Sequence, residues 1–402
     1  MPKVSKRAHL MPESPIRKLA PFALKAEKKG VHIHHLNIGQ PDIASPKNAL
    51  DSIKKHKIET LSYAPSNGFE SYRIKLSKYY QEKQIEISPE EIIITTGGSE
   101  ALSFAVSCVC DPGDEVIIPE PYYANYLGFS TSAGVSVLPL TCLLKEDFAL
   151  PASETIKSLI SEKTKAIILC NPGNPTGRLY DNIELERIRS IAIEHDLYVI
   201  SDEVYREFAY DGKKHKSILS LEGMEENGIL IDSVSKRYSL CGARIGLIAS
   251  KNKIFMNSAM KFAQARLSPP TLAQIVSEAA LETDKNYFTK VIDEYISRRN
   301  YMVNRLNKIP GVKCSNPSGA FYCVAELPIN NSDHFCQWML KDFEFRRETV
   351  MLAPCTGFYS NQELGRTQVR LAYVLKIKEL QRAMDCLEHG LKKYLESTHA
   401  NH

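Results

Sequence analysis

The chain has 402 residues, of which 43% are hydrophobic and 24% charged, with a formal net charge of +4. This composition is typical of a globular protein with room for more than one domain, and it argues against a disordered or fibrous chain. The charge is spread without a basic block and no apolar run approaches the ~18 residues of a membrane span, so neither nucleic acid nor a membrane is an expected partner.

Ten cysteines are scattered along the sequence without a regular spacing, which is typical of a reduced compartment. The first twenty residues are basic but lack the continuous apolar core of a secretory signal. We therefore expect a cytoplasmic protein.

The N-terminal region begins with few signals of order over residues 1–13. Ser14-Pro15 then predicts the start of a helix that ends at Gly30, and residues 36–42 predict a short strand that runs into a turn. Histidines 32, 34 and 35 are of a type that binds metals, but the sequence offers no matching pair of ligands elsewhere. We favour a role at the edge of a strand and predict no metal.

From residue 91 the sequence alternates between strand and helix patterns. We expect strands at 92–96, 115–118, 135–138, 166–170, 197–202 and 229–234, and helices at 99–110, 122–133, 153–161 and 182–195. This alternation predicts an α/β fold with a mostly parallel sheet and helices on both faces. Only nine residues separate Val234 from Arg244, too few for a parallel crossover, so the strand that starts near Arg244 should be antiparallel.

The C-terminal region has a different character. A long helical pattern over 287–309 stops at Pro310-Gly311, and strands at 312–314, 320–326 and 350–352 then mix with helices at 333–343 and 377–396. This pattern predicts a smaller α+β domain. We expect a large domain over 46–300, a small domain over 301–402, and an N-terminal arm and helix over 1–45 that associate with the small domain.

Three motifs follow successive strands of the predicted sheet. The first is Thr95–Leu102, where two glycines precede a helix and offer backbone N–H groups to a phosphate. The second is the rigid loop Asn171–Gly177, and the third is Asp202-Glu203-Val204-Tyr205. Ligands of open α/β sheets bind at the carboxyl ends of strands, so these motifs should face one crevice. Each motif alone could also be a helix cap or a structural turn.

A fourth motif centres on Lys236, which lies in a loop between two apolar runs. Ser233 and Ser235 precede the lysine, and Arg244 follows eight positions later. A desolvated lysine can lose its proton and attack an aldehyde, while hydroxyls and a guanidinium suit a phosphate. The pattern is that of a lysine that holds an aldehyde cofactor, although taken alone it would better fit a surface lysine in a Ser-rich loop.

In this order and spacing the motifs GGSEAL, NPGNPTG, SDEVY, SVSK with its arginine, and QVRLAY resemble the class I aminotransferase family. The resemblance runs from about Ser14 to near the C-terminus and is greatest to bacterial aspartate aminotransferases. It implies the fold of fold-type-I enzymes that depend on pyridoxal 5′-phosphate (PLP). It also implies a homodimer with shared active sites.

The resemblance assigns roles to individual residues. Lys236 matches the lysine that binds the cofactor and moves the proton at the substrate Cα, and Asp202 matches the partner of the pyridine nitrogen. Asn174 and Tyr205 match donors to the ring 3′-oxygen, and Arg370 matches the arginine that binds the substrate α-carboxylate. The other expected site residues are Gly98, Ser99, Glu100, Ser233, Ser235 and Arg244 at the phosphate, Tyr123 on the ring and beside the substrate with Asn174, Gly39 beside the carboxylate, and Tyr63 at the partner subunit's phosphate.

The substrate is less well defined, because some relatives carry a lysine for the distal carboxylate where this chain has Ser99. Arg266, from a segment near which relatives place a distal arginine, is the first replacement considered, and Arg17 is the second. An ordinary ion pair at a subunit interface is the alternative for Arg266. We expect a transaminase that uses aspartate and 2-oxoglutarate.

Other donors (alanine, aromatic or other dicarboxylic amino acids) remain open, and a lyase or decarboxylase on the same site is less favoured. A transcription regulator built on this domain is disfavoured, since the residues before Ile92 match the family's own N-terminal part.

Overall fold

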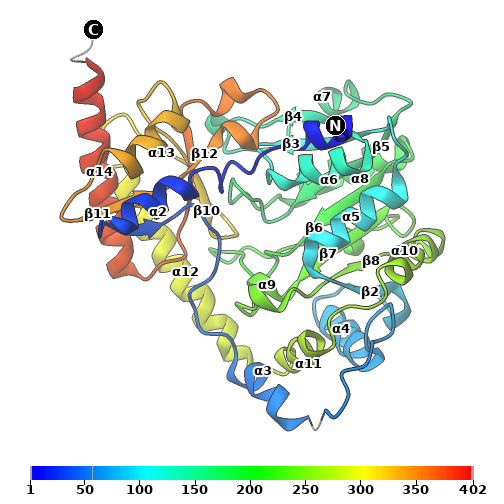
Figure 1. Cartoon of the computed structure of the whole chain (residues 1–402). Coiled ribbons are helices and arrows are strands. Elements are labelled where there is room, and N and C mark those ends of the chain that lie inside the picture. The colour runs from blue at the N-terminus through cyan, green and yellow to red at the C-terminus, as the bar shows by residue number, and fades with distance from the viewer. Residues whose placement is uncertain (1, 57, 400–402) are drawn as a thin grey trace.

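The computed structural model describes residues 2–56 and 58–399, and a seven-stranded sheet forms the centre of its larger part (Figure 1). The strand order is β2-β8-β7-β6-β5-β3-β4. Strand β8 is antiparallel to both of its neighbours, as predicted from the short connection after Val234, while the other pairings are parallel. The strands are β2 (Ile92–Thr95), β3 (Glu115–Glu120), β4 (Ser136–Thr141), β5 (Thr164–Cys170), β6 (Tyr198–Asp202), β7 (Gly228–Ser233) and β8 (Gly246–Ala249).

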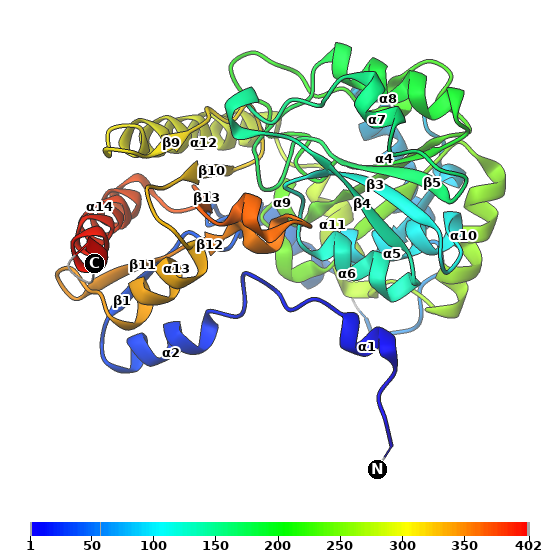
Figure 2. The same cartoon turned by 90° about the horizontal axis from the view of Figure 1, so that it is seen from above.

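Both faces of this sheet are covered by helices, because alternate side chains of each strand enter two different cores. On β2, Ile93 packs in one core, while Ile92 and Ile94 pack in the other. Figure 2 shows the two sets of helices on either side of the sheet. The first core includes α5 (Gly97–Val109), α6 (Asn125–Ala133) and α10 (Lys253–Ala265), and the second includes α4 (Glu70–Glu82), α7 (Ser153–Lys157), α8 (Asn182–Glu194) and α11 (Thr271–Ala280).

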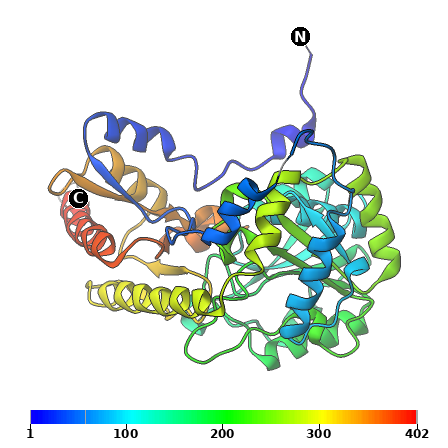
Figure 3. The ribbon, with the colours of Figure 1, turned by 90° about the horizontal axis from the view of Figure 1, so that it is seen from below.

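The second part of the molecule packs around a third core and carries two small sheets. An antiparallel sheet has the order β12-β13-β10-β9, and β1 pairs in parallel with β11. Figure 3 shows this part beside the larger one, with α12 extending between them. The elements are β1 (His32–His35), β9 (Lys313–Cys314), β10 (Tyr322–Glu326), β11 (Glu348–Met351), β12 (Ala353–Pro354), β13 (Gln368–Ala372), α2 (Ala20–Lys28), α12 (Lys285–Leu306), α13 (Ser332–Lys341) and α14 (Ile377–His399).

The N-terminal segment departs from the sequence prediction in two places. The predicted helix from Ser14 begins only at Ala20, after a series of turns. Pro21 explains the difference, because proline fits the first turn of α2 but would break the hydrogen bonding inside a helix that began at Ser14. The predicted strand at 36–42 lies earlier, as β1, where backbone pairing with β11 is available.

Residues before α2 also form a short helix, α1 (Lys6–Leu10), where a loose arm was expected. Its Arg7 donates a hydrogen bond to the carbonyl of Ser132 at the end of α6, over 2.9 Å. Helix α1 therefore contacts the larger part of the molecule, whereas α2 and β1 pack in the core of the C-terminal part.

We propose the division into 1–45, 46–300 and 301–402 that the sequence suggested, with α12 passing through the last boundary as one continuous helix. Residues 1, 57 and 400–402, which these ranges include, lie outside the described part of the chain. None of the helices in residues 2–56 and 58–399 combines the length and apolar character that a membrane span requires.

Candidate active site

The main cavity, of about 660 Å³, opens where the carboxyl ends of the central strands meet the C-terminal part. Its wall combines the ends of β5, β6 and β7 with the start of α5, the segment after β1, and strands β10 and β13. The motifs predicted to face one crevice therefore do so. The predicted site residues that line it are Gly39, Gly98, Ser99, Tyr123, Asn174, Asp202, Tyr205, Ser233, Ser235, Lys236, Arg244 and Arg370.

Lys236 lies on a one-turn helix, α9 (Val234–Arg237), that begins directly after β7. The hydroxyl of Ser233 caps this turn by accepting a hydrogen bond from the backbone N–H of Ser235 over 3.1 Å. The Lys236 Nζ donates to the carbonyl of Gly39 over 2.7 Å. A fixed turn thus holds the amine in the cavity with a neutral acceptor as its hydrogen-bond partner.

Asp202, the last residue of β6, is buried at the floor of the cavity. Its Oδ2 accepts a hydrogen bond from the Tyr126 hydroxyl over 2.7 Å, and it makes no ion pair among the described residues. Burial raises the pKa of Asp202 to about 6. This carboxyl can therefore share a proton with a basic nitrogen that enters the cavity.

Arg370 projects from β13 and is almost completely buried. Its Nη1 donates to Asn174 Oδ1 over 3.0 Å and its Nη2 donates to the carbonyl of Asn37. The guanidinium carbon lies 4.6 Å from the centre of the Tyr322 ring. No acidic side chain within the described chain pairs with Arg370, so this buried cation is available for an incoming carboxylate.

The opposite wall is a cradle for an anion at the start of α5, where backbone N–H groups have no partner within the helix. Gly97 has a φ of +74°, and a Cβ there would lie 2.4 Å from Arg244 Nη2. A Cβ on Gly246 would lie 2.5 Å from the Gly97 carbonyl carbon. Glycine at both positions therefore keeps the N-terminus of α5 close to Arg244, with Ser99 and Ser235 beside them.

Two tyrosines complete the cavity without having been identified from the sequence. The Tyr322 hydroxyl lies 2.9 Å from the Tyr205 hydroxyl, and Tyr126 holds Asp202. Tyr126 also packs edge-on against the ring of Tyr123, with 5.5 Å between ring centres. The spacing of three residues between Tyr123 and Tyr126, in a segment predicted to be helical, could have indicated the contact between their two rings.

Three predicted residues do not line this cavity within one chain. Glu100 turns its carboxylate back onto the N–H of Thr96 and onto Arg266, at 2.8 and 2.7 Å, which leaves only its backbone for the cradle. Arg266 also donates to the carbonyl of Ser66 over 2.9 Å, and these contacts, all within one chain, favour a structural ion pair over a substrate-binding role for Arg266. Tyr63 is 81% exposed and lies outside the cavity.

Comparison with known sequences gives matches over almost the whole chain. The family model described as aminotransferase class I and II matches residues 31–387. An aspartate aminotransferase of Bacillus subtilis is 29% identical and covers 98% of this chain and 100% of its own. An aspartate aminotransferase of Pyrococcus abyssi is 33% identical, with 97% of this chain and 98% of its own covered.

A solved structure of an alanine aminotransferase from Pyrococcus furiosus has the same fold. Its TM-score is 0.89 at 32% identity, and the match covers 97% of this chain and 100% of that one. Relatives of this similarity thus carry two different substrate names, aspartate and alanine.

Proposed function

Because this chain belongs to the aminotransferase class I and II family, we propose that L-aspartate is its preferred amino donor and 2-oxoglutarate its acceptor. The coarser activity follows from the family: the chain is a fold-type-I aminotransferase, and its cofactor is PLP. The alternatives that we retain are alanine or another amino donor and, less favoured, a lyase or decarboxylase reaction.

The donors and acceptors of the cavity fit this cofactor. The cradle of Ser99, Ser235 and Arg244 provides hydroxyls, backbone N–H groups and a cation for a phosphate. Asp202 offers a buried carboxylate oxygen to a pyridine nitrogen, and Lys236 offers an amine to an aldehyde. We therefore propose that these five residues, with Asn174, Tyr205 and Tyr123, hold PLP.

When bound, PLP supplies an aldehyde for the amine and a ring that withdraws electrons from the substrate Cα. The main support for this function is that Arg370 is buried in the cavity wall and has no acidic partner in the described chain. Arg370 would bind the substrate α-carboxylate through two parallel hydrogen bonds and hold that group in place. Lys236 would then take and return the proton of the Cα at its Nζ, and Tyr205 would keep its hydroxyl aimed by the contact with Tyr322. A held carboxylate favours transamination over decarboxylation.

The choice of aspartate rests on Arg17. This residue lines the cavity from the turn before α2, and its guanidinium makes no hydrogen bond or ion pair among the described residues. An exposed, unpaired guanidinium at the cavity wall is suited to a distal carboxylate. The alanine alternative is supported by Ser99, which replaces a cation, and by the engagement of Arg266 with Glu100.

We also propose a cytoplasmic homodimer with shared active sites. Large apolar side chains remain exposed from α3 (Lys47–Ser52) to Tyr63 and around the start of α11, and the Thr271 hydroxyl donates a hydrogen bond to the carbonyl of Ser62 between these two regions. These side chains are Leu50, Ile53, Leu61, Tyr63, Leu267 and Leu272. A second copy that covers them would receive Tyr63 near its phosphate. The scattered cysteines, which suit a reduced compartment, support the proposed cytoplasmic location.

A panel of amino donors with 2-oxoglutarate tests the substrate proposal. For Arg17→Gln we expect kcat/KM for aspartate to fall at least about tenfold relative to that for alanine. Lys18→Gln is the matched control, because Lys18 pairs with Asp333 outside the cavity. Wild-type enzyme that prefers alanine would overturn aspartate as the donor but leave the transaminase, and a selective loss in Arg266→Gln would instead assign the distal site to Arg266. Sedimentation of an active monomer would exclude the dimer.

A further inference from the structure

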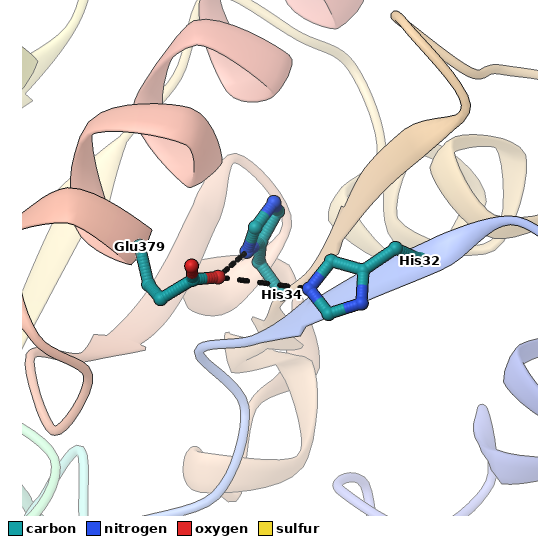
Figure 4. A group of neighbouring side chains, drawn as sticks. All are labelled: His32, His34 and Glu379. Atoms are coloured by element: carbon teal, nitrogen blue, oxygen red, sulfur yellow. Dashed lines mark ion pairs between the residues drawn. The ribbon is translucent and has the colours of Figure 1, made fainter.

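Strand β1 brings two histidines to the face that packs against α14. Side chains alternate along a strand, so His32 and His34 share one face while Ile33 and His35 share the other. His35 lines the main cavity, and the first pair therefore points away from it. Figure 4 shows both imidazoles directed at the carboxylate of Glu379 in the first turn of α14.

The distances from Glu379 to the two histidines are close to those between ligands of one metal ion. Glu379 Oε2 lies 3.2 Å from His34 Nδ1 and 3.6 Å from His32 Nε2. The three candidate ligand atoms all lie within 4.8 Å of one another. Tetrahedral zinc with bonds of about 2.0–2.2 Å places its ligand atoms roughly 3.3–3.6 Å apart.

His34 has an unexplained polar atom at this point. Its side chain is fully buried, and its Nδ1 makes no hydrogen bond within the described residues despite the nearby carboxylate. Its other nitrogen, Nε2, lies 3.0 Å from Glu348 Oε2. A proton on Nε2 that is donated to Glu348 leaves the lone pair of Nδ1 free, which is the carboxylate–histidine arrangement found behind metal ligands.

The charges around His34 suit a divalent cation. Arg382 contacts both Glu348 and Glu379, so the two carboxylates and one guanidinium carry a net charge of −1. The Arg382 Nε donates to Glu348 Oε2 over 3.0 Å, and the same oxygen lies 3.0 Å from His34 Nε2, where it can accept a proton from that nitrogen. His32, with 56% of its side chain exposed, leaves a side open for water as a further ligand.

We propose that His32 Nε2, His34 Nδ1 and Glu379 Oε2 form a binding site for a divalent transition-metal ion, zinc in the first place. The ion would link β1 to α14. Strand β1 leads directly to Asn37 and Gly39, whose carbonyls accept hydrogen bonds from Arg370 and Lys236. The site therefore stabilises the segment that supports the cavity without taking part in the reaction.

A competing set of ligands is less suitable. His34, Glu348 and Cys386 also lie close together, with His34 in both sets. Glu348 is already paired with Arg382 and hydrogen-bonded to His34, and Cys386 is buried, so this set has no exposed member that leaves room for water as a further ligand. The two sets predict opposite results for Cys386 and His32 variants.

The test is zinc binding by the PLP-loaded enzyme after treatment with a chelator. We expect one zinc ion per chain to bind by calorimetry and to raise Tm with increasing zinc concentration. Loss of a supporting carboxylate weakens metal binding by about 10–100-fold, and we expect this loss of zinc affinity for Glu348→Gln. His32→Gln and Glu379→Gln remove ligands themselves and should each weaken zinc binding at least as much. Zinc binding that persists in the double variant His32→Gln/Glu379→Gln reports weaker sites formed by other thiols and imidazoles.

Two control variants separate this site from the alternatives. His195→Gln removes a histidine that lies 3.6 Å from a carboxylate, that of Glu194, as His32 lies from Glu379. We expect this variant to bind zinc as the wild type does. Cys386→Ser should retain wild-type affinity, and Co²⁺ in place of zinc should show no thiolate charge-transfer band at this site. Equal zinc affinity in wild type and the double variant would reduce the cluster to ion pairs and overturn the proposal, as would a loss of binding in Cys386→Ser with His32→Gln unaffected.

Discussion

Two groups of buried ionisable side chains flank Lys236, and they differ in how their charges are balanced. In the anchor cluster, formed by Tyr80, Arg206, Asp232 and Arg237, the Asp232 carboxylate pairs with Arg237 and lies 3.8 Å from Arg206. The Tyr80 hydroxyl also donates to Asp232 over 2.6 Å. Each charged group of the anchor cluster thus has an oppositely charged partner within the chain, since Arg206 also lies 3.9 Å from Glu203.

The cavity shows the opposite condition. Neither Asp202 nor Arg370 makes an ion pair among the described residues, although both are buried as deeply as the anchor cluster. Unpaired buried charge destabilises a fold, so such groups persist where a ligand supplies the missing partner. The balance of charge, rather than the type of residue or its burial, therefore distinguishes the cavity residues from the structural ones.

The largest expected effect tests the amine between the two groups. Lys236→Ala should lower turnover by at least about 10²–10⁴-fold, because it removes the amine that we propose moves the proton. Borohydride should no longer fix PLP covalently to the chain. Arg237→Lys is the matched control from the anchor cluster, since it keeps the charge beside Asp232 and leaves Lys236 in place. A near-normal transaminase rate in Lys236→Ala would contradict its assignment.

The second effect concerns stability and should appear only in the anchor cluster. Asp232→Asn leaves Arg237 buried without its counter-charge, which costs about 3–5 kcal/mol of unfolding free energy. Asp51→Asn removes an exposed pair with Lys54 and should cost no more than about 1 kcal/mol. Urea midpoints of the three proteins measure the difference, and similar midpoints would show that the anchor cluster is not required for stability.

The third effect is also on the free energy of unfolding but has the opposite sign, because here the ionised carboxylate lowers stability. Asp202 has its pKa raised from 3.8 to about 6 by burial, so between these values the folded state binds more protons than the unfolded state. The stability of the cofactor-free protein should therefore fall as pH rises from about 4 to 6, by roughly 2–3 kcal/mol for this group. Asp202→Asn should remove that slope and raise Tm at pH 8, while it weakens PLP retention.

Thermal melts of cofactor-free protein at several pH values measure this effect. Glu186→Gln is a control for an exposed carboxylate, since Glu186 pairs with Arg189 at the surface. If Asp202→Asn were less stable than wild type at pH 8, the Asp202 carboxylate would stabilise the fold as Asp232 does, and the difference between the cavity and the anchor cluster would not hold.

Much of the fold and of the cavity could be predicted from the sequence, because the signals are local. Asp202 ends an apolar strand and Lys236 lies three positions after the end of another, while the nine-residue connection after Val234 predicts the antiparallel β8. The remaining contacts depend on partners that are distant in the chain. Arg266 meets Glu100 across 166 positions, and Tyr322 meets Tyr205 across 117, so no local pattern announces either contact.

Some elements were absent from the prediction for a related reason. Helices α10 and α11 pack in the two cores on opposite faces of the sheet, but their segments were not assigned to any element. Arg370 was identified through its motif, whereas its strand β13 was not predicted, because that strand is defined by pairing with β10. Pairing between distant strands is a tertiary property that a short segment does not encode.

The smallest expected effect tests whether a tyrosine at the cavity differs from one in the core. Tyr322→Phe keeps the ring under Arg370 but removes the hydroxyl that contacts Tyr205 at 2.9 Å. Loss of one buried hydrogen bond costs about 1 kcal/mol, which corresponds to roughly a fivefold fall in kcat/KM if the contact positions Tyr205. Tyr210→Phe is the matched control, because the Tyr210 hydroxyl donates to the carbonyl of Ala320 in the core of the C-terminal part. We expect Tyr210→Phe to lower the urea midpoint with little change in kcat/KM, and Tyr322→Phe to lower kcat/KM at least as clearly as the midpoint. If both variants lost stability and retained activity equally, Tyr322 would belong with the core, and the unpaired charges of Asp202 and Arg370 alone would define the site.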